Sequence, residues 1–278
     1  MYLAGIDVGS TVTKAVVLKG EEIAAVVIRR TGAEHRRLTN KVMEEALAKA
    51  GIVLDRIDCV VATGYGRINV PFADKQLTEI TCHAKGVSWL LPSAKTIIDI
   101  GGQDSKGIKL LNGKVHDFVM NDKCAAGTGR FLEVVAETLG IKMEDMGTLS
   151  LESDKAEQIS NTCALFADEE LAVLLGKGSK KQDIIAGIHQ GVAARICNMA
   201  GRVKIEPDVV VTGGGGKNIG LVKSIEKHLN LNVLTPPEPL ITGAIGAALL
   251  AKEQIQKKKL IVDKKKRKLE ESKFFDKG

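Results

Sequence analysis

Two stretches of the chain share one pattern of apolar and polar positions. Residues 3–11 read LAGIDVGST and residues 96–105 read TIIDIGGQDS, so each is a short apolar run that ends in Asp-x-Gly before small or polar residues. Short apolar runs bounded by turn residues are typical of buried strands. We therefore expect a strand over residues 2–7 and a second copy of it that reaches Asp99.

The positions after each copy match as well. Each Asp-x-Gly turn precedes two β-rich runs joined by a short turn, Gly20-Glu21-Glu22 in the first half and the hairpin signal Asn112-Gly113 in the second. A helical pattern follows in both halves. The expected strands cover residues 13–18, 23–28, 107–111 and 115–119, and the expected helices cover residues 40–50 and 129–139. The pattern predicts an internal repeat at the level of architecture.

A third apolar run leads into the glycine tract VVVTGGGGKN at residues 209–218. Glycine has no Cβ, so consecutive N–H groups in such a turn can converge on phosphate oxygens. An Asp at a strand end can hold a Mg²⁺ ion that bridges those phosphates. One strand-to-glycine turn is most often only a turn, but three in this order predict a nucleotide site, with Asp7 and Asp99 beside the metal.

Composition limits the class of protein. The chain has 278 residues, of which 44% are apolar and 3% aromatic, so Val, Ile, Leu and Ala must build the cores. This length suits one large domain or two modest ones. No run approaches the 18 apolar residues of a membrane-spanning helix, and the start lacks the basic and hydrophobic segments of a leader. We expect a cytoplasmic protein that does not contact membranes.

The formal charge of +6 is concentrated at the C-terminus. Residues 257–278 contain ten Lys or Arg and four Asp or Glu, so the rest of the chain is close to neutral. A folded body without a basic face is not expected to bind nucleic acid. We expect this tail to be a solvent-exposed appendage. The expected division is residues 1–95 for a first subdomain, 96–256 for a second, and 257–278 for the tail.

The order of these motifs resembles the superfamily of acetate and sugar kinases, heat-shock chaperone ATPases and actin, over about residues 3–255. The resemblance implies an α/β fold of two actin-like (ribonuclease H-like) subdomains, with ATP and Mg²⁺ in the cleft between them. It also implies three loops around the nucleotide. The first phosphate loop would comprise Asp7, Gly9, Ser10, Thr11 and Lys14; the second would comprise Asp99, Gly101, Gly102, Gln103 and Asp104; and the adenosine loop would comprise Gly213, Gly214, Gly215, Gly216, Lys217 and Asn218.

Catalytic roles follow from that assignment only in part. Asp7 or Asp99 would organise Mg²⁺, and Gln103 or Asp104 would orient the attacking water. The sequence does not decide which member of either pair dominates.

Five segments resemble a narrower family, the ATP-dependent activators (component A) of 2-hydroxyacyl-CoA dehydratases and the related ATPase subunits of benzoyl-CoA reductases. They are ATGYGR (62–67), EITCHAKG (79–86), DIGGQDSK (99–106), NDKCAAGTGRFLE (121–133) and NTCALFADEE (161–170). The resemblance implies a homodimer that holds one [4Fe–4S] cluster between its subunits. ATP hydrolysis would drive a low-potential electron from ferredoxin or flavodoxin to a partner iron–sulfur enzyme. In the fourth segment, Gly127, Thr128 and Glu133 would contact the nucleotide.

Two of the five cysteines are candidate cluster ligands. Cys124 and Cys163 each precede a predicted helix, whose N-terminus favours an anionic ligand. Two such cysteines from each subunit of a two-fold dimer complete a Cys₄ site. Zinc suits the same four ligands, and only the resemblance decides for iron.

The other three cysteines have plainer interpretations. Cys59 and Cys197 lie in apolar patterns and are expected to be buried small hydrophobes. Cys82 and His83 are adjacent in an expected helix, where neighbouring side chains point about 100° apart, so they make a poor chelating pair. Packing or an interface is the favoured explanation, and their role stays open.

Two other functions fit the same motifs. One is a small-molecule kinase of the same fold, and the other is a non-redox ATPase whose subunits are joined by zinc. The sequence also does not name the partner. A 2-hydroxyacyl-CoA dehydratase is the leading candidate, but a benzoyl-CoA reductase type of acceptor or another cluster-bearing acceptor, such as a double-cubane protein, would use the same segments.

Overall fold

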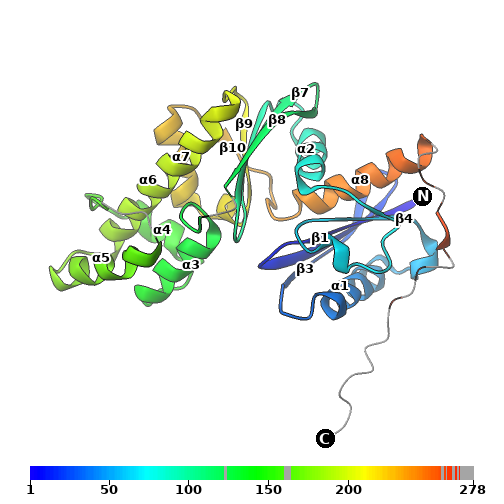
Figure 1. The fold of residues 1–278 in the computed structure, drawn as a ribbon, viewed down its shortest axis with the longest axis horizontal. Coiled ribbons are helices and arrows are strands. Elements are labelled where there is room, and N and C mark those ends of the chain that lie inside the picture. Colours follow the sequence, from blue (N-terminus) through cyan, green and yellow to red (C-terminus); the bar gives the residue numbers. More distant parts are fainter. Residues whose placement is uncertain are drawn as a thin grey trace, which may run out of the picture. The chain divides into compact units, whose positions relative to one another are not determined.

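A computed structural model describes residues 1–121, 124–159, 164–257, 260, 262–264, 267 and 269. The chain forms two compact units, Met1–Leu90 with Ile241–Gly278, and Leu91–Leu240 (Figure 1). The first boundary falls close to the expected one. The second differs, because residues 241–256 were expected in the second subdomain.

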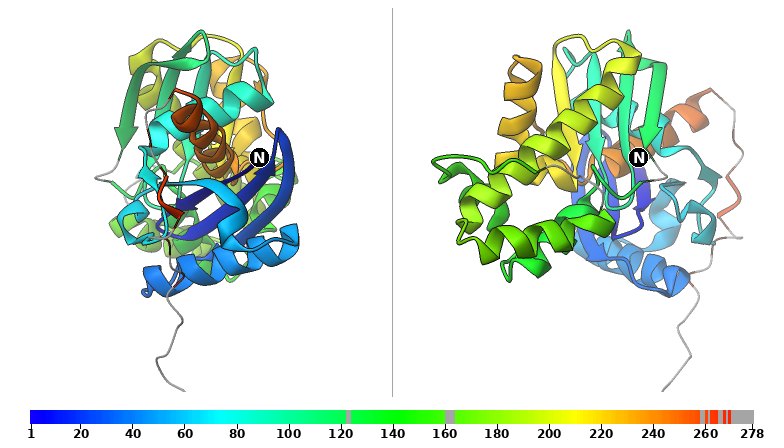
Figure 2. Two further views of the ribbon diagram at one scale, coloured as in Figure 1. Left: turned by 90° about the vertical axis from the view of Figure 1, so that its right-hand side faces the viewer. Right: turned by 60° about the vertical axis from the view of Figure 1, so that its left-hand side comes forward.

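The first unit is built on a five-stranded sheet in the order β3-β2-β1-β4-β5. The central strand β1 pairs antiparallel with β2 and parallel with β4. Helix α1 covers one face, and α2 and α8 cover the other (Figure 2). The elements are β1 (Tyr2–Val8), β2 (Val12–Lys19), β3 (Glu22–Arg30), α1 (His35–Ala50), β4 (Ile57–Thr63), β5 (Lys75–Gln76), α2 (Glu79–Leu90) and α8 (Thr242–Gln256).

The second unit repeats this topology. Its sheet has the order β10-β9-β6-β7-β8, with β6 antiparallel to β7 and parallel to β9. Helices α3, α6 and α7 pack around one large core cluster with β6 and β9. The elements are β6 (Thr96–Ile100), β7 (Ser105–Leu111), β8 (Lys114–Asn121), α3 (Gly129–Thr138), α4 (Met146–Leu151), α5 (Ala164–Gly176), α6 (Lys181–Ala200), β9 (Val209–Gly213), α7 (Ile219–Leu229) and β10 (Val233–Leu234).

The expected internal repeat is therefore confirmed. Strands β1 and β6 occupy the same place in their sheets, and their residues are buried almost throughout, because layers cover both faces. The expected strands and helices are present, although α1 begins five residues earlier than predicted, at His35. Within the described residues, no helix is long and apolar enough to cross a membrane.

Helix α8 explains the corrected boundary. Ten of its consecutive residues, Thr242–Ala251, are buried, and the apolar side chains among them pack in the same core cluster as Leu3, Val61 and Cys82 of the first unit. A helix that is apolar on most sides must be covered by its surroundings. Its partners are β1, β4 and α2, so α8 completes the first unit although it follows the second in the sequence.

The described part of the C-terminal tail is docked, and not wholly solvent-exposed as we expected. The guanidinium of Arg267 donates to both carboxylate oxygens of Asp74 and to the carbonyl oxygens of Ile57 and Asp58. The Arg267 side chain is 2% exposed and that of Asp74 is 7% exposed. A buried arginine with this many acceptors ties the tail to the start of β4.

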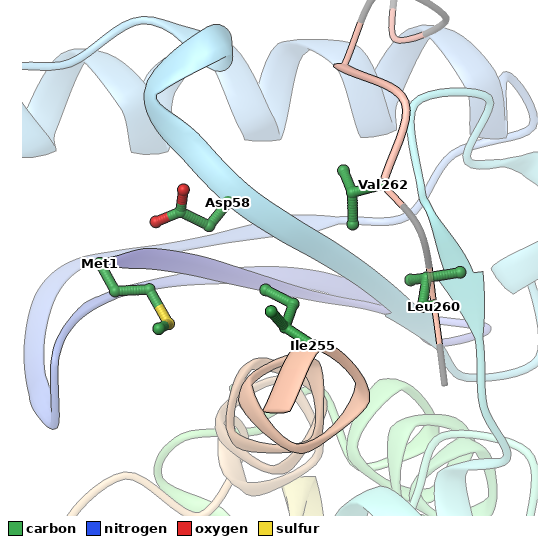
Figure 3. Close-up of a pocket in the computed structure, with 5 residues that line it drawn as sticks. All are labelled: Met1, Asp58, Ile255, Leu260 and Val262. Atoms are coloured by element: carbon green, nitrogen blue, oxygen red, sulfur yellow. The ribbon is translucent and has the colours of Figure 1, made fainter. Parts of the chain in front are cut away.

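Apolar residues of the tail also pack on the first unit. Leu260 and Val262 lie against the core cluster that contains the apolar residues of α8. Leu269 lies against the core cluster that contains Val42 and Met43 of α1. A cavity of about 290 Å³ remains beneath the segment, lined by Met1, Asp58, Ile255, Leu260 and Val262 (Figure 3). The positive charge of the tail predicted that it would be solvent-exposed, but the apolar residues between its lysines give this segment a buried face.

We predict that Arg267→Ala lowers the free energy of unfolding of the first unit by about 3–5 kcal/mol, because it leaves the Asp74 carboxylate buried without its cation. The single tryptophan of the chain, Trp89, lies in α2, so urea unfolding followed by tryptophan fluorescence reports on this unit. The matched control is Lys264→Ala, since Lys264 pairs with Asp58 at a partly exposed site and should contribute about 1 kcal/mol or less. If Arg267→Ala and the unmodified chain unfolded at the same urea concentration, the result would contradict the docking of the tail on the first unit.

Candidate nucleotide loops and cysteine loop

The first phosphate loop joins β1 to β2. Asp7 is 3% exposed, and its Oδ2 lies 2.9 Å from Nζ of Lys14, its cross-strand neighbour on β2. The N–H of Gly9 donates to the carbonyl of Val12 at 3.1 Å and closes the turn. Ser10 and Thr11 are partly exposed at its tip. The sheet therefore holds a buried carboxylate and ammonium side by side below an accessible turn.

The second phosphate loop joins β6 to β7 in the same way. Asp99 is 3% exposed, and Nζ of Lys106 lies 3.6 Å from its Oδ2 and 2.7 Å from Oδ1 of Asp104. The N–H of Gly101 donates to the carbonyl of Asp104 at 2.9 Å. Gln103 is exposed, and Gly102 is partly exposed. Of the two candidates for orienting water, Asp104 is held by Lys106, whereas Gln103 projects from the turn.

The repeat therefore extends to single residues. Both loops read Asp-x-Gly-x₄-Lys, and in both the lysine is the cross-strand neighbour of the aspartate. Our sequence reasoning singled out Lys14 and missed Lys106. The shared seven-residue spacing was the signal that would have found it.

A second repeated pair, Thr-Gly, stands on the other side of each aspartate. Thr63 on β4 is the parallel neighbour of Asp7, and Thr212 on β9 is that of Asp99, to whose Oδ1 it donates at 2.8 Å. Gly64 (φ 87°) and Gly213 (φ 75°) follow. A Cβ there would lie 2.4 Å from Oδ1 of Asp7 and 2.9 Å from Oδ1 of Asp99 respectively. Both positions need glycine for their backbone angle and for the space that the carboxylate occupies.

Cys82 and His83 are packing residues of the first unit. Cys82 is fully buried, and Nδ1 of His83 lies 3.0 Å from Oγ1 of Thr242 at the start of α8. A Cβ on Gly243 would lie 3.1 Å from both Nε2 of His83 and Oδ2 of Asp7. His83 therefore stands close behind the first phosphate loop, which its sequence context did not indicate.

The adenosine loop runs from the end of β9 into α7. Residues Gly214–Lys217 form a 3₁₀ turn, and Asn218 caps α7 by accepting the N–H of Leu221 at 3.0 Å. Gly215 and Gly216 pack closely on Ile100 and Pro239, while a Cβ on Gly214 would meet nothing nearer than 4.0 Å. Lys217 pairs with Glu238 at the surface. Among the four glycines of the tract, only Gly214 has open space above it.

The cysteine loop connects β8 to α3, and it differs from our expectation. Helix α3 begins at Gly129, five residues after Cys124, so Cys124 is not at the helix N-terminus. Gly127 turns the chain with a φ of 88°, and the side chain of Thr128 donates to the carbonyl of Ala125. This tight turn separates Cys124 from the helix that we expected it to precede directly.

The N-terminus of α3 is instead occupied by the second phosphate loop. The N–H groups of Gly129 and Arg130 donate to the carbonyls of Gly101 and Gly102, both at 2.8 Å. Ser105 donates to the carbonyl of Gly127 at 2.6 Å. The cysteine loop and the second phosphate loop are thus one hydrogen-bonded structure. Glu133 lies on α3 one turn further on, where it pairs with Arg130.

Cys124 has a different environment from the other described cysteines. It is partly exposed, and Nη2 of Arg195 donates to its Sγ at 3.4 Å. Cys59, Cys82 and Cys197 are buried, and burial raises the pKa of each thiol to about 12. Cys163, the other predicted ligand, lies outside the described residues. Cys124 is therefore a partly exposed thiol beside a positive charge, which suits an anionic metal–sulfur group.

Known proteins match this chain over most of its length. The activator of lactoyl-CoA dehydratase from Anaerotignum propionicum is 46% identical over 260 residues, which are 93% of this chain and all of that protein. Component A of (R)-2-hydroxyglutaryl-CoA dehydratase from Acidaminococcus fermentans, a solved structure, is 44% identical with a TM-score of 0.88, over 92% of this chain and 99% of that one. These matches confirm the actin-like fold and the resemblance that the five segments indicated.

A second solved structure includes a nucleotide analogue. It is the activator of 2-hydroxyisocaproyl-CoA dehydratase from Clostridium difficile with bound ADPNP, 42% identical with a TM-score of 0.88, over 95% of this chain and 99% of that one. The family model described as the BadF/BadG/BcrA/BcrD ATPase family matches residues 4–251. With its two Asp-x-Gly-x₄-Lys loops and these matches, the chain belongs to the BadF/BadG/BcrA/BcrD ATPase family.

Proposed function

We propose that this protein is a dehydratase activator: an ATPase that delivers a low-potential electron to a partner iron–sulfur enzyme, most simply a 2-hydroxyacyl-CoA dehydratase. The observation that supports this most directly is the direct hydrogen bonding of the second phosphate loop to the loop of Cys124. In the proposal, the protein acts in the cytoplasm as a homodimer and takes its electron from ferredoxin or flavodoxin. Its 46% identity to an activator of lactoyl-CoA dehydratase supports the choice of partner.

The residues of both phosphate loops suit a magnesium nucleotide. Carboxylate oxygens are the ligands that Mg²⁺ prefers, and Asp7 and Asp99 are held at strand ends next to backbone turns. Lys14 and Lys106 supply point charges of the kind that bind phosphate. In this proposal each lysine shares its charge between its aspartate and the incoming phosphate oxygens. That ATP lies in a cleft between the two subdomains remains a prediction.

Gln103 is the residue that we assign to the attacking water. It is exposed at the tip of the second loop, and an amide can both accept from and donate to water. Asp104 is assigned to positioning, because Lys106 binds its carboxylate at 2.7 Å. Gly214 is the position in the adenosine loop with room for a nucleoside to approach.

Cys124 suits a ligand of a shared iron–sulfur cluster. The residue is partly exposed, and its sulfur stands next to the guanidinium of Arg195. With Cys163, each subunit would contribute two thiolates, and a two-fold dimer would contribute four. When bound, a [4Fe–4S] cluster would supply a one-electron carrier whose potential responds to charge and hydrogen bonds around its sulfurs. Arg195 is the described residue placed to exert that effect.

We predict that Gln103→Ala lowers the rate of ATP hydrolysis by about 100-fold, because the water loses a fixed hydrogen-bonding partner. The affinity for ADPNP should change by less than about threefold, since the aspartates and lysines stay in place. Steady-state hydrolysis and titration calorimetry measure the two quantities. Gln190→Ala, an exposed glutamine on α6, is the matched control and should hydrolyse ATP normally. Unchanged turnover in Gln103→Ala would contradict the assignment.

Metal analysis separates the three candidate functions. Protein purified without oxygen should be brown and contain about two iron atoms and two sulfides per chain. Cys124→Ser should lose the iron, because the cluster loses two of its four ligands per dimer, whereas Cys197→Ser removes a buried thiol and should retain it. Stoichiometric zinc would favour the zinc-linked ATPase. A colourless, metal-free protein after iron–sulfide reconstitution would favour a kinase.

A further inference from the structure

Helix α6 contacts both the adenosine loop and the cysteine loop. It covers Lys181–Ala200, and His189 and Arg195 stand six residues apart on it, about 9 Å along the helix axis. His189 reaches the cap of α7, and Arg195 reaches Cys124. Two loops that are 94 residues apart in sequence, at Cys124 and Asn218, are therefore held by one helix.

The contact at His189 is buried and specific. The side chain is 0% exposed, and its Nε2 lies 3.0 Å from Nδ2 of Asn218. Because Oδ1 of Asn218 accepts the N–H of Leu221, its Nδ2 is the donor and His189 is the acceptor. Burial lowers the pKa of His189 to about 4, so the ring is neutral at physiological pH. The orientation of the Asn218 amide thus depends on a residue of α6.

The contact at Arg195 combines a hydrogen bond with packing. Nη2 lies 3.4 Å from Sγ of Cys124, and the aliphatic part of the side chain runs over the turn at Gly127, 3.5 Å from where a Cβ would stand. Ile196 packs on the same turn. A shift of α6 at this point therefore moves both the charge beside Cys124 and the backbone that follows it.

The helix between the two contacts is held in the core. Its inward face is formed by Ile188, Val192 and Ile196, all within the large core cluster of the second unit. Well-packed interiors transmit displacement because they contain little free volume. At its N-terminal half, Gly187 lies so close to the backbone of Glu157 that a Cβ would be 2.1 Å from that carbonyl oxygen. These contacts favour movement of α6 as one body.

We propose that His189 and Arg195 are positioning residues through which α6 couples nucleotide binding at the adenosine loop to the environment of Cys124. Binding that reorients Asn218 displaces α6 through His189, and Arg195 carries the displacement to the sulfur. The coupling is reciprocal, as any coupling between two binding equilibria must be. It rests on the proposed nucleotide site, and it identifies a route distinct from the hydrogen bonds between α3 and the second phosphate loop.

The test measures the reactivity of Cys124 in the full-length protein prepared free of iron. N-ethylmaleimide is applied in pulses with and without saturating ADPNP, and mass spectrometry quantifies the peptide that contains Cys124. The buried thiols of Cys59, Cys82 and Cys197 serve as slow internal references. We expect ADPNP to change the alkylation rate of Cys124 by at least about fivefold, the lower end of typical coupling between sites.

Variants distinguish α6 from other routes. Arg195→Gln, a change at an exposed position, should abolish the response to ADPNP while the ADPNP affinity stays within about threefold. His189→Leu should also abolish it, whereas His189→Gln retains an acceptor for Asn218 and should preserve it. The control Gln190→Ala should respond like the unmodified chain. If His189→Leu fails to fold, as judged by circular dichroism, the response of Arg195→Gln to ADPNP still tests whether the coupling passes through α6.

Failure of the coupling and failure of the proposed function give different results. ADPNP that binds without changing Cys124 alkylation overturns the coupling alone. A full response in Arg195→Gln does the same, because the change then reaches Cys124 by another route. Absence of ADPNP binding to the unmodified chain overturns the proposed function and the coupling with it.

Discussion

A carboxylate buried at the end of a central strand destabilises the fold unless a cation or hydrogen-bond donors compensate it. Both sheets meet this constraint with the same residue types, although Lys14 donates to Asp7 whereas Thr212 donates to Asp99. Asp7 has Lys14 as its cross-strand neighbour, Asp99 has Lys106, and a Thr-Gly pair closes the other side of each carboxylate. These two pairs are held in place by the strand order and by the tight Asp-x-Gly turn. The glycine that follows each threonine leaves the space that the carboxylate occupies.

The same arrangement suits the ATP hydrolysis that we propose. A carboxylate and an ammonium that are already positioned in low-dielectric surroundings need little reorganisation when charged groups arrive. In the second unit the loop around Asp99 also receives the first N–H groups of α3, which leads back to Cys124. The turn after Asp99 is therefore linked to the cysteine loop over a few hydrogen bonds. Helix α6 adds a second connection, since His189 contacts Asn218 and Arg195 contacts Cys124.

Much of the fold could be predicted from short stretches of the sequence. The Asp-x-Gly turns, the strands around them and the repeat follow from apolar runs of strand length and from turn residues, which act within a few positions. Lys106 was accessible too, by the spacing it shares with Lys14, but only a residue-by-residue comparison of the two halves reveals it. The five matched segments predicted the family, because a long and specific set of short sequences is shared with it.

Other features depend on contacts between distant residues. Helix α8 and Arg267 belong to the first unit because of what buries them, which no local pattern specifies. Cys124 was expected directly before a helix, but residues 125–128, which hydrogen bonds from Asn121 and Ser105 hold in a turn, separate it from α3.

His189 and Arg195 look like ordinary helical residues, and their partners lie 29 and 71 positions away. The sequence by itself determined the strands, the turns and the family, since these depend on neighbouring residues. Tertiary structure decided which charges are buried and which loops touch, since burial and long-range hydrogen bonds exist only once the chain has packed.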